Sequence, residues 1–116
     1  MLSLKRFDNI FIYREFVDFR KGINGLCLVV QEEMNLNPLD NYLFIFCNNK
    51  RDKVKAIYWD FNGFAMWYKC LDSAKYKWPI HLDDEVIKIN IKEMHKFLKG
   101  FNPWESGHKK LNFSHI

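Results

Sequence analysis

The 116-residue sequence is poor in the features that cross-link a chain or insert it into a membrane. It has only three cysteines, Cys27, Cys47 and Cys70, which form no CxxC pair and each lie within an apolar run. Such cysteines usually serve as small buried hydrophobes, and they indicate a reduced, cytoplasmic protein rather than a disulfide scaffold. The N-terminal residues turn polar within a few positions, which predicts no signal peptide. No apolar run approaches the roughly 18 residues that a membrane span needs.

The common signatures of catalysis and of metal or cofactor binding are also missing. There is no GxSxG, no Walker or dinucleotide pattern, and no HxxxH or HExxH spacing among His81, His95, His108 and His115. Gly22 and Gly25 form a GxxG, which leaves two readings open, a phosphate contact through free N–H groups or a tight entry turn. We therefore expect no catalytic residue, no metal ligand and no cofactor.

The acidic residues need separate treatment because metal-dependent DNA cleavage uses several carboxylates around two cations. The available ones read as residues that end strands or cap turns, and a domain of this length leaves little room for a nuclease fold with DNA-binding elements. The sequence therefore predicts that the protein is not an enzyme. The carboxylates in question are Asp18, Asp60, Asp72, Asp83, Asp84 and Glu85.

Hydrophobic and aromatic residues are plentiful, at 48% and 17% of the chain. That content is ample for a packed core and is not typical of a disordered chain. The length suits one domain. We expect a single domain over residues 1–116, with a core from about 10 to 100 and a tail over 101–116.

Periodicity and turn signals predict the order strand, helix, three or four antiparallel strands, helix. An i, i+3, i+4 apolar stripe from Ile23 to Met34 predicts the first helix, which Asp18 or Asn24 would cap. Asn62-Gly63 predicts a tight primed turn, because both residues tolerate positive φ. Ile91, Met94, His95 and Leu98 share one face of the second helix, which Gly100 ends. Strands are predicted over residues 10–13, 42–47, 54–60 and 64–71, with a short one over 75–78 and an apolar run at 86–89.

This order is typical of an α+β domain. We expect an antiparallel sheet of about four to five strands, with two main helices packed on one of its faces.

Basic residues interleaved with aromatic ones are a further pattern that suggests a ligand. The net charge is +4, which permits nucleic-acid binding without requiring it. Cations that bind phosphate are predicted at Arg20, Lys21, Lys50, Arg51, Lys53 and Lys55. Trp59, Trp67 and Trp78 are candidate stacking or partner-binding aromatics. The alternative is structural, since most aromatics of a sheet domain are core and most lysines are solvated.

Several blocks of the sequence together resemble a known family. They are Val17–Leu26 (VDFRKGINGL), Leu43–Phe46 (LFIF), the basic run Lys50–Lys55, Tyr58–Phe64 (YWDFNGF), Lys75–Pro79 and Phe97–Gly100. In this order, over about three-quarters of the chain, they resemble the TnpB-type accessory protein of the insertion sequence 66 family, encoded by its second reading frame. That protein is distinct from the RNA-guided nucleases that share its name. Cys47, Cys70 and Ala74 depart from the family pattern, and the departures remove positive charge beside the last hairpin.

The resemblance implies a non-catalytic role in transposition of a bacterial insertion sequence, beside a separate transposase of the same element. Together with the basic residues, it predicts a cytoplasmic module that binds DNA and helps to assemble the transposase. The alternative is a protein–protein adaptor without DNA contact, which an exposed aromatic patch around Trp67, Tyr68 and Trp78 would favour.

Overall fold

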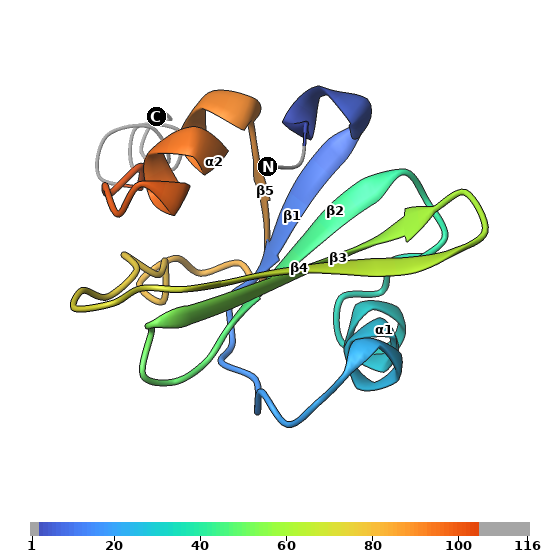
Figure 1. Ribbon diagram of the computed structural model, residues 1–116, viewed down its shortest axis with the longest axis horizontal. Coiled ribbons are helices and arrows are strands. Elements are labelled where there is room, and N and C mark those ends of the chain that lie inside the picture. The colour runs from blue at the N-terminus through green and yellow to red at the C-terminus, as the bar shows by residue number, and fades with distance from the viewer. Residues whose placement is uncertain (1–2, 105–116) are drawn as a thin grey trace.

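Five strands and two α-helices make up the part of the chain, residues 3–104, that the computed structural model describes (Figure 1). The predicted α+β class is confirmed. The elements are the 3-10 helix η1 (Leu4–Arg6), β1 (Asn9–Tyr13), α1 (Ile23–Glu32), β2 (Tyr42–Cys47), β3 (Lys53–Asp60), β4 (Gly63–Cys70), β5 (Val86–Ile89) and α2 (Ile91–Leu98).

The strands form one sheet in the order β4-β3-β2-β1-β5. Three of the four pairings are antiparallel, as expected, but β1 and β2 run parallel, with Ile10 opposite Leu43 and Ile12 opposite Ile45. Parallel neighbours need a crossover connection, and the segment that contains α1 supplies it. The fully antiparallel sheet of the prediction is therefore wrong at this one pairing.

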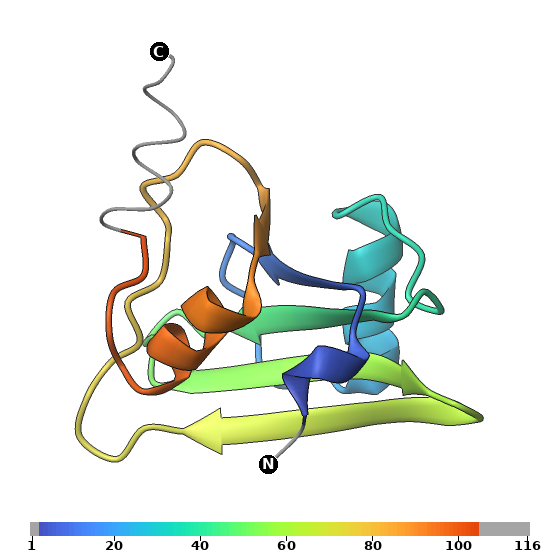
Figure 2. The same cartoon turned by 90° about the horizontal axis from the view of Figure 1, so that it is seen from above.

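The two helices lie on opposite faces of the sheet, not on one face as predicted (Figures 1 and 2). The central strand β2 explains this arrangement, because Leu43, Phe44, Ile45 and Phe46 are all buried. Successive strand residues point to opposite faces, so a continuous apolar strand needs cover on both. Leu43 and Ile45 pack in the core that α2 covers, whereas Phe44 and Phe46 pack in the core under α1.

The short strand predicted at residues 75–78 is absent from the described chain, and the apolar run Val86–Ile89 supplies the fifth strand instead. The side chains of Tyr76 and Trp78 both insert into the core on the α2 side, and the polar residues between and beside them face solvent. The segment therefore has the two-residue alternation of a strand, but its backbone does not pair with a neighbouring strand. Pro79, which has no N–H to donate, follows directly.

The β3–β4 hairpin is confirmed, but its turn lies one residue earlier than predicted. Asp60 pairs with Gly63, so the two central residues are Phe61 and Asn62, and the positive φ of 58° belongs to Phe61. The N–H of Asn62 donates to the carbonyl of Asp60 at 2.5 Å, an i→i+2 hydrogen bond that closes a three-residue turn around Phe61. The cross-strand pair below it, Trp59 with Phe64, packs edge to face at 5.1 Å.

The helix ends also refine the predictions. Neither Asp18 nor Asn24 caps α1, because its N-cap is Gly22, without a side-chain hydrogen bond. Gly100, with φ of 90°, follows α2 and ends it as predicted.

The core extends past its expected limit near residue 100, because Trp104 is fully buried against Phe97. Of the expected tail 101–116, residues 105–116 lie outside the described chain. Within residues 3–104, no helix has the length and apolarity to cross a membrane.

Candidate nucleic-acid interface

The six predicted phosphate-binding cations come from two segments that meet at one end of the sheet. Arg20 and Lys21 precede α1, whereas the other four, Lys50, Arg51, Lys53 and Lys55, lie in the β2–β3 loop and the start of β3. The parallel pairing of β1 and β2 brings their carboxyl ends to the same edge. The N–H of Val17, after β1, donates to the carbonyl of Cys47 at 3.0 Å. We call these six residues the loop surface.

Lys55 joins the two halves of the loop surface. Its Nζ donates to the carbonyls of Phe19 at 2.8 Å and Lys21 at 3.0 Å, and it lies 4.8 Å from the centre of the Phe19 ring. The half-buried ammonium is thereby held by two carbonyl dipoles and an aromatic face. Lys55 therefore acts first as a clamp between β3 and the segment before α1.

A shallow groove of about 470 Å³ runs between the two segments. Its lining combines apolar residues with polar and charged ones, including Asp18 and two lysines of the loop. The lining residues are Phe16, Val17, Asp18, Phe19, Asn48, Asn49, Lys50 and Lys53.

The carboxylates near the loop surface are ionised at neutral pH. Asp18 accepts from the side chain and the backbone of Arg20, which lowers the pKa of Asp18 to about 2, and the Arg20–Asp18 ion pair measures 2.5 Å. The side-chain amide of Asn48 donates to Asp52 at 2.7 Å and lowers the pKa of that carboxyl. Arg20 is thus partly neutralised.

The other cations of the loop surface carry no such partner. Within the described residues, Lys21, Lys50, Arg51 and Lys53 form no ion pair. These four side chains are therefore the ones with charge to offer to an anion.

The backbone of the β2–β3 loop is fixed by its own side chains and by a distant segment. Asn48 Oδ1 accepts from the N–H of Lys53 at 3.0 Å, and Arg51 adopts a positive φ of 60°. From the other side, Lys75 Nζ donates to the carbonyl of Lys50, and the N–H of Tyr76 donates to the carbonyl of Arg51, both at 2.6 Å. Lys75 therefore adds a seventh cation, which the sequence interpretation did not assign to this site because the contact spans 25 residues.

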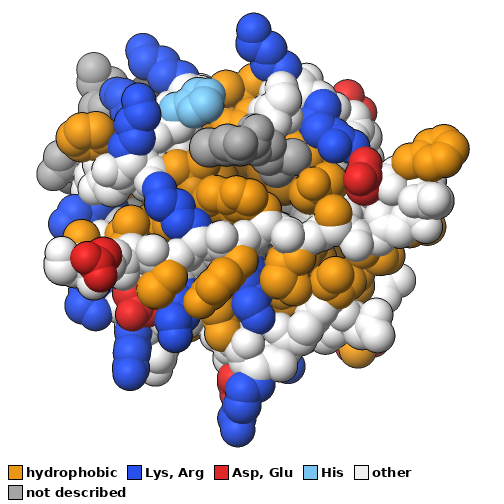
Figure 3. Space-filling model, in the orientation of Figure 1, with side chains coloured by type: hydrophobic (Ala, Val, Ile, Leu, Met, Phe, Trp, Pro, Cys, Tyr) orange, Lys and Arg blue, Asp and Glu red, His pale blue; other side chains and the backbone are white. Residues whose placement is uncertain are grey.

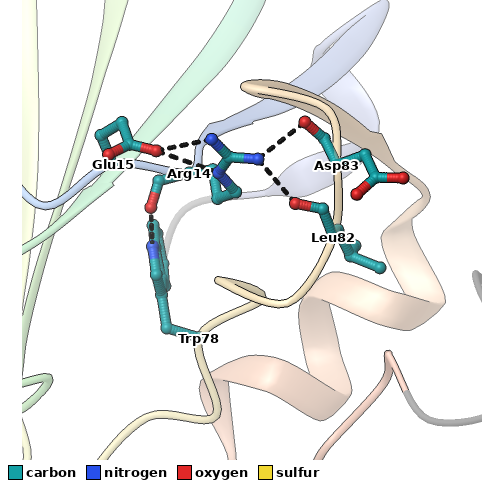
Figure 4. Close-up of polar contacts among 5 residues, drawn as sticks. All are labelled: Arg14, Glu15, Trp78, Leu82 and Asp83. Carbon is teal, nitrogen blue, oxygen red and sulfur yellow. Dashed lines mark hydrogen bonds and ion pairs between the residues drawn. The ribbon is translucent and has the colours of Figure 1, made fainter.

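Trp78 is not available for stacking, which corrects its place among the predicted aromatics. Its side chain is 4% exposed, and its indole N–H donates to the carbonyl of Arg14 at 2.6 Å. The Arg14 guanidinium in turn binds Glu15 and the carbonyls of Leu82 and Asp83 (Figure 4). Trp78 is thus a core residue that anchors the segment after β4.

The other two predicted tryptophans lie away from the loop surface. Trp59 is half-buried near the β3–β4 turn, at the opposite end of β3 from Lys53. Trp67 is half-buried against the core on the α2 side, whereas Tyr68, the next residue along β4, points to the other face, 6.5 Å from the ring of Phe19. Trp67, Tyr68 and Trp78 therefore do not form the single patch that would favour an adaptor.

Two cysteines and the arrangement of possible metal ligands bear on catalysis in the described part of the chain. Cys47 is buried, and burial raises the pKa of its thiol to about 12, so it carries almost no thiolate at neutral pH. Burial also raises the pKa of Cys27. Over residues 3–104, no group of three or more His, Cys, Asp or Glu side chains is placed to hold a metal ion.

Comparison with known proteins gives the family. The family model described as IS66 Orf2 like protein matches residues 8–108, a span that contains the loop surface and both helices. The chain belongs to the IS66 Orf2-like family. Membership implies a transposition-associated accessory role.

Two proteins of Sinorhizobium fredii (strain NBRC 101917 / NGR234) resemble this IS66 Orf2-like chain. The one named "Uncharacterized protein y4jC" is 33% identical over 79 residues, which cover 68% of each chain. The one named "Uncharacterized protein y4hO" is 37% identical over 70 residues, which cover 60% of this chain and 61% of that protein. No solved structure matches the chain significantly.

Proposed function

We propose that this IS66 Orf2-like protein is a non-catalytic module that binds DNA through the loop surface and assists the transposase of the same insertion sequence. The single observation that carries the proposal is the clamp made by Lys55. It holds the segment before α1 against the β2–β3 loop and so gathers cations that lie far apart in the sequence. Cations gathered on a fixed backbone are suited to phosphate groups, whose spacing along a duplex is regular.

The charge balance supports the same proposal. Lys21, Lys50, Arg51 and Lys53 have no ion-pair partner among the described residues, and Lys75 lies beside them. A fold does not need such a cluster, because like charges held close together repel one another. Release of counterions from DNA would offset that repulsion on binding.

The test is fluorescence anisotropy with labelled duplex DNA, from the ends of the element and of random sequence, over a series of salt concentrations. The double variant Lys50→Glu with Lys53→Glu is expected to weaken binding strongly and to flatten the salt dependence. Each lost phosphate contact reduces the slope by about 0.9. Arg51 is left unchanged because its positive φ makes it a poor site for substitution.

The matched control is Lys5→Glu with Lys88→Glu, which changes the net charge equally at two exposed lysines outside the loop surface. Equal loss of affinity in both double variants would mean that only net charge matters, and the assignment of the loop surface would fail. A preference for element-end DNA over random DNA would extend the proposal to site recognition.

A second candidate function is a protein–protein contact at the tip of the β3–β4 hairpin. Phe61 is 90% exposed there and adopts a strained positive φ, although it packs against little. An exposed aromatic at a rigid turn is typical of a partner contact. Loss of co-purification with the transposase in Phe61→Ser, with duplex binding intact, would support this adaptor function over the first.

A further inference from the structure

A second cationic surface runs along the outer side of α2. The groove there has a volume of about 890 Å³, and its lining combines basic side chains with two apolar ones and an amide. We call it the α2 groove; it is lined by Ile91, Lys92, His95, Lys96, Lys99, Phe101 and Asn102.

The helical period places the cations on one side of α2. Lys92, His95, Lys96 and Lys99 are spaced i, i+3, i+4 and i+7 and are all exposed, while the opposite side is buried in the core. The sequence interpretation grouped His95 with the buried side, which is wrong. In the space-filling view a histidine and neighbouring lysine or arginine side chains gather where Figure 1 places α2, with no acidic side chain among them (Figure 3).

Among residues 3–104, the groove lining contains no carboxylate to neutralise these cations. Glu93, the acidic residue of α2, belongs to the capping box at the start of the helix, where its side chain accepts from the N–H of Asn90 at 2.9 Å. Like charges at i, i+4 destabilise a helix, so the stripe works slightly against folding. An anionic ligand would remove that repulsion.

The chain turn after α2 fixes an aromatic ring at the end of the groove. The N–H of Phe101 donates to the carbonyl of Lys96 and that of Gly100 to the carbonyl of Phe97, both at 3.0 Å, which is the Schellman pattern. Its usual apolar contact is between the residues that here are Phe101 and Lys96. Because lysine stands at the second of these positions, the Phe101 ring stays 62% exposed.

We propose that the α2 groove binds an unpaired segment of nucleic acid, with Lys92, Lys96 and Lys99 on its phosphates and the Phe101 ring stacked on a base. Duplex bases are already stacked on one another and cannot present a face to the ring, whereas single-stranded bases can. The chain's own residues 105–116 are a poor electrostatic match for the groove, because they include Lys109 and Lys110 against one acidic side chain, Glu105.

The groove and the loop surface are linked through one segment. Lys75 contacts the carbonyl of Lys50, and a depression beside it has Lys75, Lys77 and Gly100 in its lining, together with the carboxylates of Asp52 and Asp72. A strand that leaves the groove on this side toward a duplex on the loop surface would find phosphate contacts at Lys75 and Lys77, which Asp52 and Asp72 oppose. The inference rests on the proposed function only for this junction, since the groove itself is defined by α2 and Phe101.

The test measures anisotropy of labelled oligothymidylate and of a duplex of equal length. Phe101→Ala is expected to weaken oligothymidylate binding about 5- to 160-fold, the range for loss of one aromatic–base stack, and to leave duplex binding unchanged. The control Phe61→Ala removes another exposed ring, one that is 90% exposed, and should change neither affinity. Lys96→Glu should weaken oligothymidylate binding more than Lys88→Glu, a matched charge change on the opposite face of the sheet.

Two outcomes would overturn the groove assignment. If Phe101→Ala binds oligothymidylate as tightly as Phe61→Ala does, no base stacks there. If wild-type protein binds polyglutamate as tightly as oligothymidylate, the groove fits an acidic protein and not a nucleic acid. Circular dichroism of every variant verifies that the fold is retained.

The two proposals fail separately. If duplex binding is unchanged in the Lys50→Glu, Lys53→Glu variant while Phe101→Ala weakens oligothymidylate binding, the loop-surface assignment fails and the groove assignment stands. Weaker duplex binding in the Lys50→Glu, Lys53→Glu variant, with unchanged oligothymidylate binding in Phe101→Ala, would contradict the groove assignment alone.

Discussion

The loop surface and the α2 groove are both rich in basic side chains, but they are built in different ways. The loop surface joins segments more than 25 residues apart. Two of its cations, Arg20 and Lys55, and the neighbouring Lys75 are already bound to a carboxylate or to carbonyls. The groove comes from one helix and its terminal turn, and its lysines face solvent. The first surface therefore depends on tertiary contacts, whereas the second depends on how α2 is docked.

Tyr76 connects the two constructions. Its backbone N–H holds the carbonyl of Arg51 in the loop surface, and its ring stacks on Phe97 of α2 at a centroid distance of 4.9 Å. Substitutions in α2 or in the loop surface, which both contact this residue, therefore separate the contributions of the two surfaces to stability and binding.

Removal of the Phe97 ring is expected to have the largest effect. Phe97 is fully buried and packs against Tyr76, Trp78 and Trp104, so Phe97→Ala should lower the free energy of unfolding by about 3–5 kcal/mol. Urea denaturation measures the loss. Amide hydrogen exchange should increase more in α2 than in β3, because the ring docks α2 and not the loop surface. Equal increases in both elements would show that the two surfaces form one cooperative unit.

Loss of the Lys55 ammonium should affect the loop surface selectively. Lys55→Met keeps most of the stem but removes two hydrogen bonds from a charged donor, so we expect a loss of stability of about 2 kcal/mol. Duplex binding should weaken with it, while oligothymidylate binding in the α2 groove should not. A Lys69→Met variant is the comparison, since Lys69 Nζ donates to one carbonyl, that of Leu98 on α2. If Lys55→Met is as stable as wild type, the clamp contributes nothing.

Local patterns in the sequence predicted most elements of the fold. The apolar period located both helices, and alternation with turn residues located the β3–β4 hairpin. The six cations were predicted as phosphate-binding residues from the basic and aromatic pattern of the sequence. Their convergence depends on Lys55 contacting carbonyls 34 and 36 residues away. No local pattern reports such a contact.

Other features were missed for identifiable reasons. Alternation at Tyr76 and Trp78 reports burial on one side, which a strand and a core-covering segment share. The parallel pairing of β1 with β2 depends on the path of the crossover. The cations of α2 were also missed, although the spacing of Lys92, Lys96 and Lys99 alone places them on one side of a helix.

Substitution of the linking tyrosine is expected to raise stability slightly. Tyr76 Oη is buried and has no hydrogen-bond partner among the described residues, so Tyr76→Phe should raise the free energy of unfolding by about 1 kcal/mol at pH 7. Burial, and to a lesser extent Cys47 and Cys70, raises the pKa of the Tyr76 hydroxyl. The unfolded chain therefore ionises first, and wild-type stability should fall as pH rises above about 10.

Tyr76→Phe should lose less stability than wild type over that alkaline range, which denaturation at pH 7 and pH 11 measures. Both surfaces should keep their affinities, because the backbone contact to Arg51 and the stacking on Phe97 do not involve the hydroxyl. A variant less stable than wild type at pH 7 would mean that the hydroxyl is hydrogen-bonded in solution.

The smallest expected effect concerns the carboxylate inside the loop surface. Asp18→Asn releases Arg20, which should strengthen duplex binding a few-fold and steepen its salt dependence, because one more cation becomes available. Oligothymidylate binding should not change, because the α2 groove does not include this pair. Since the Arg20 hydrogen bonds lower the pKa of Asp18 to about 2, below its unfolded value, their stabilising effect is present above pH 4 and is lost only as pH falls through about 2. Duplex affinity of the wild-type protein should therefore not change between pH 5 and pH 8 through titration of Asp18. A change in that range would mean that another group, and not Asp18, controls the affinity.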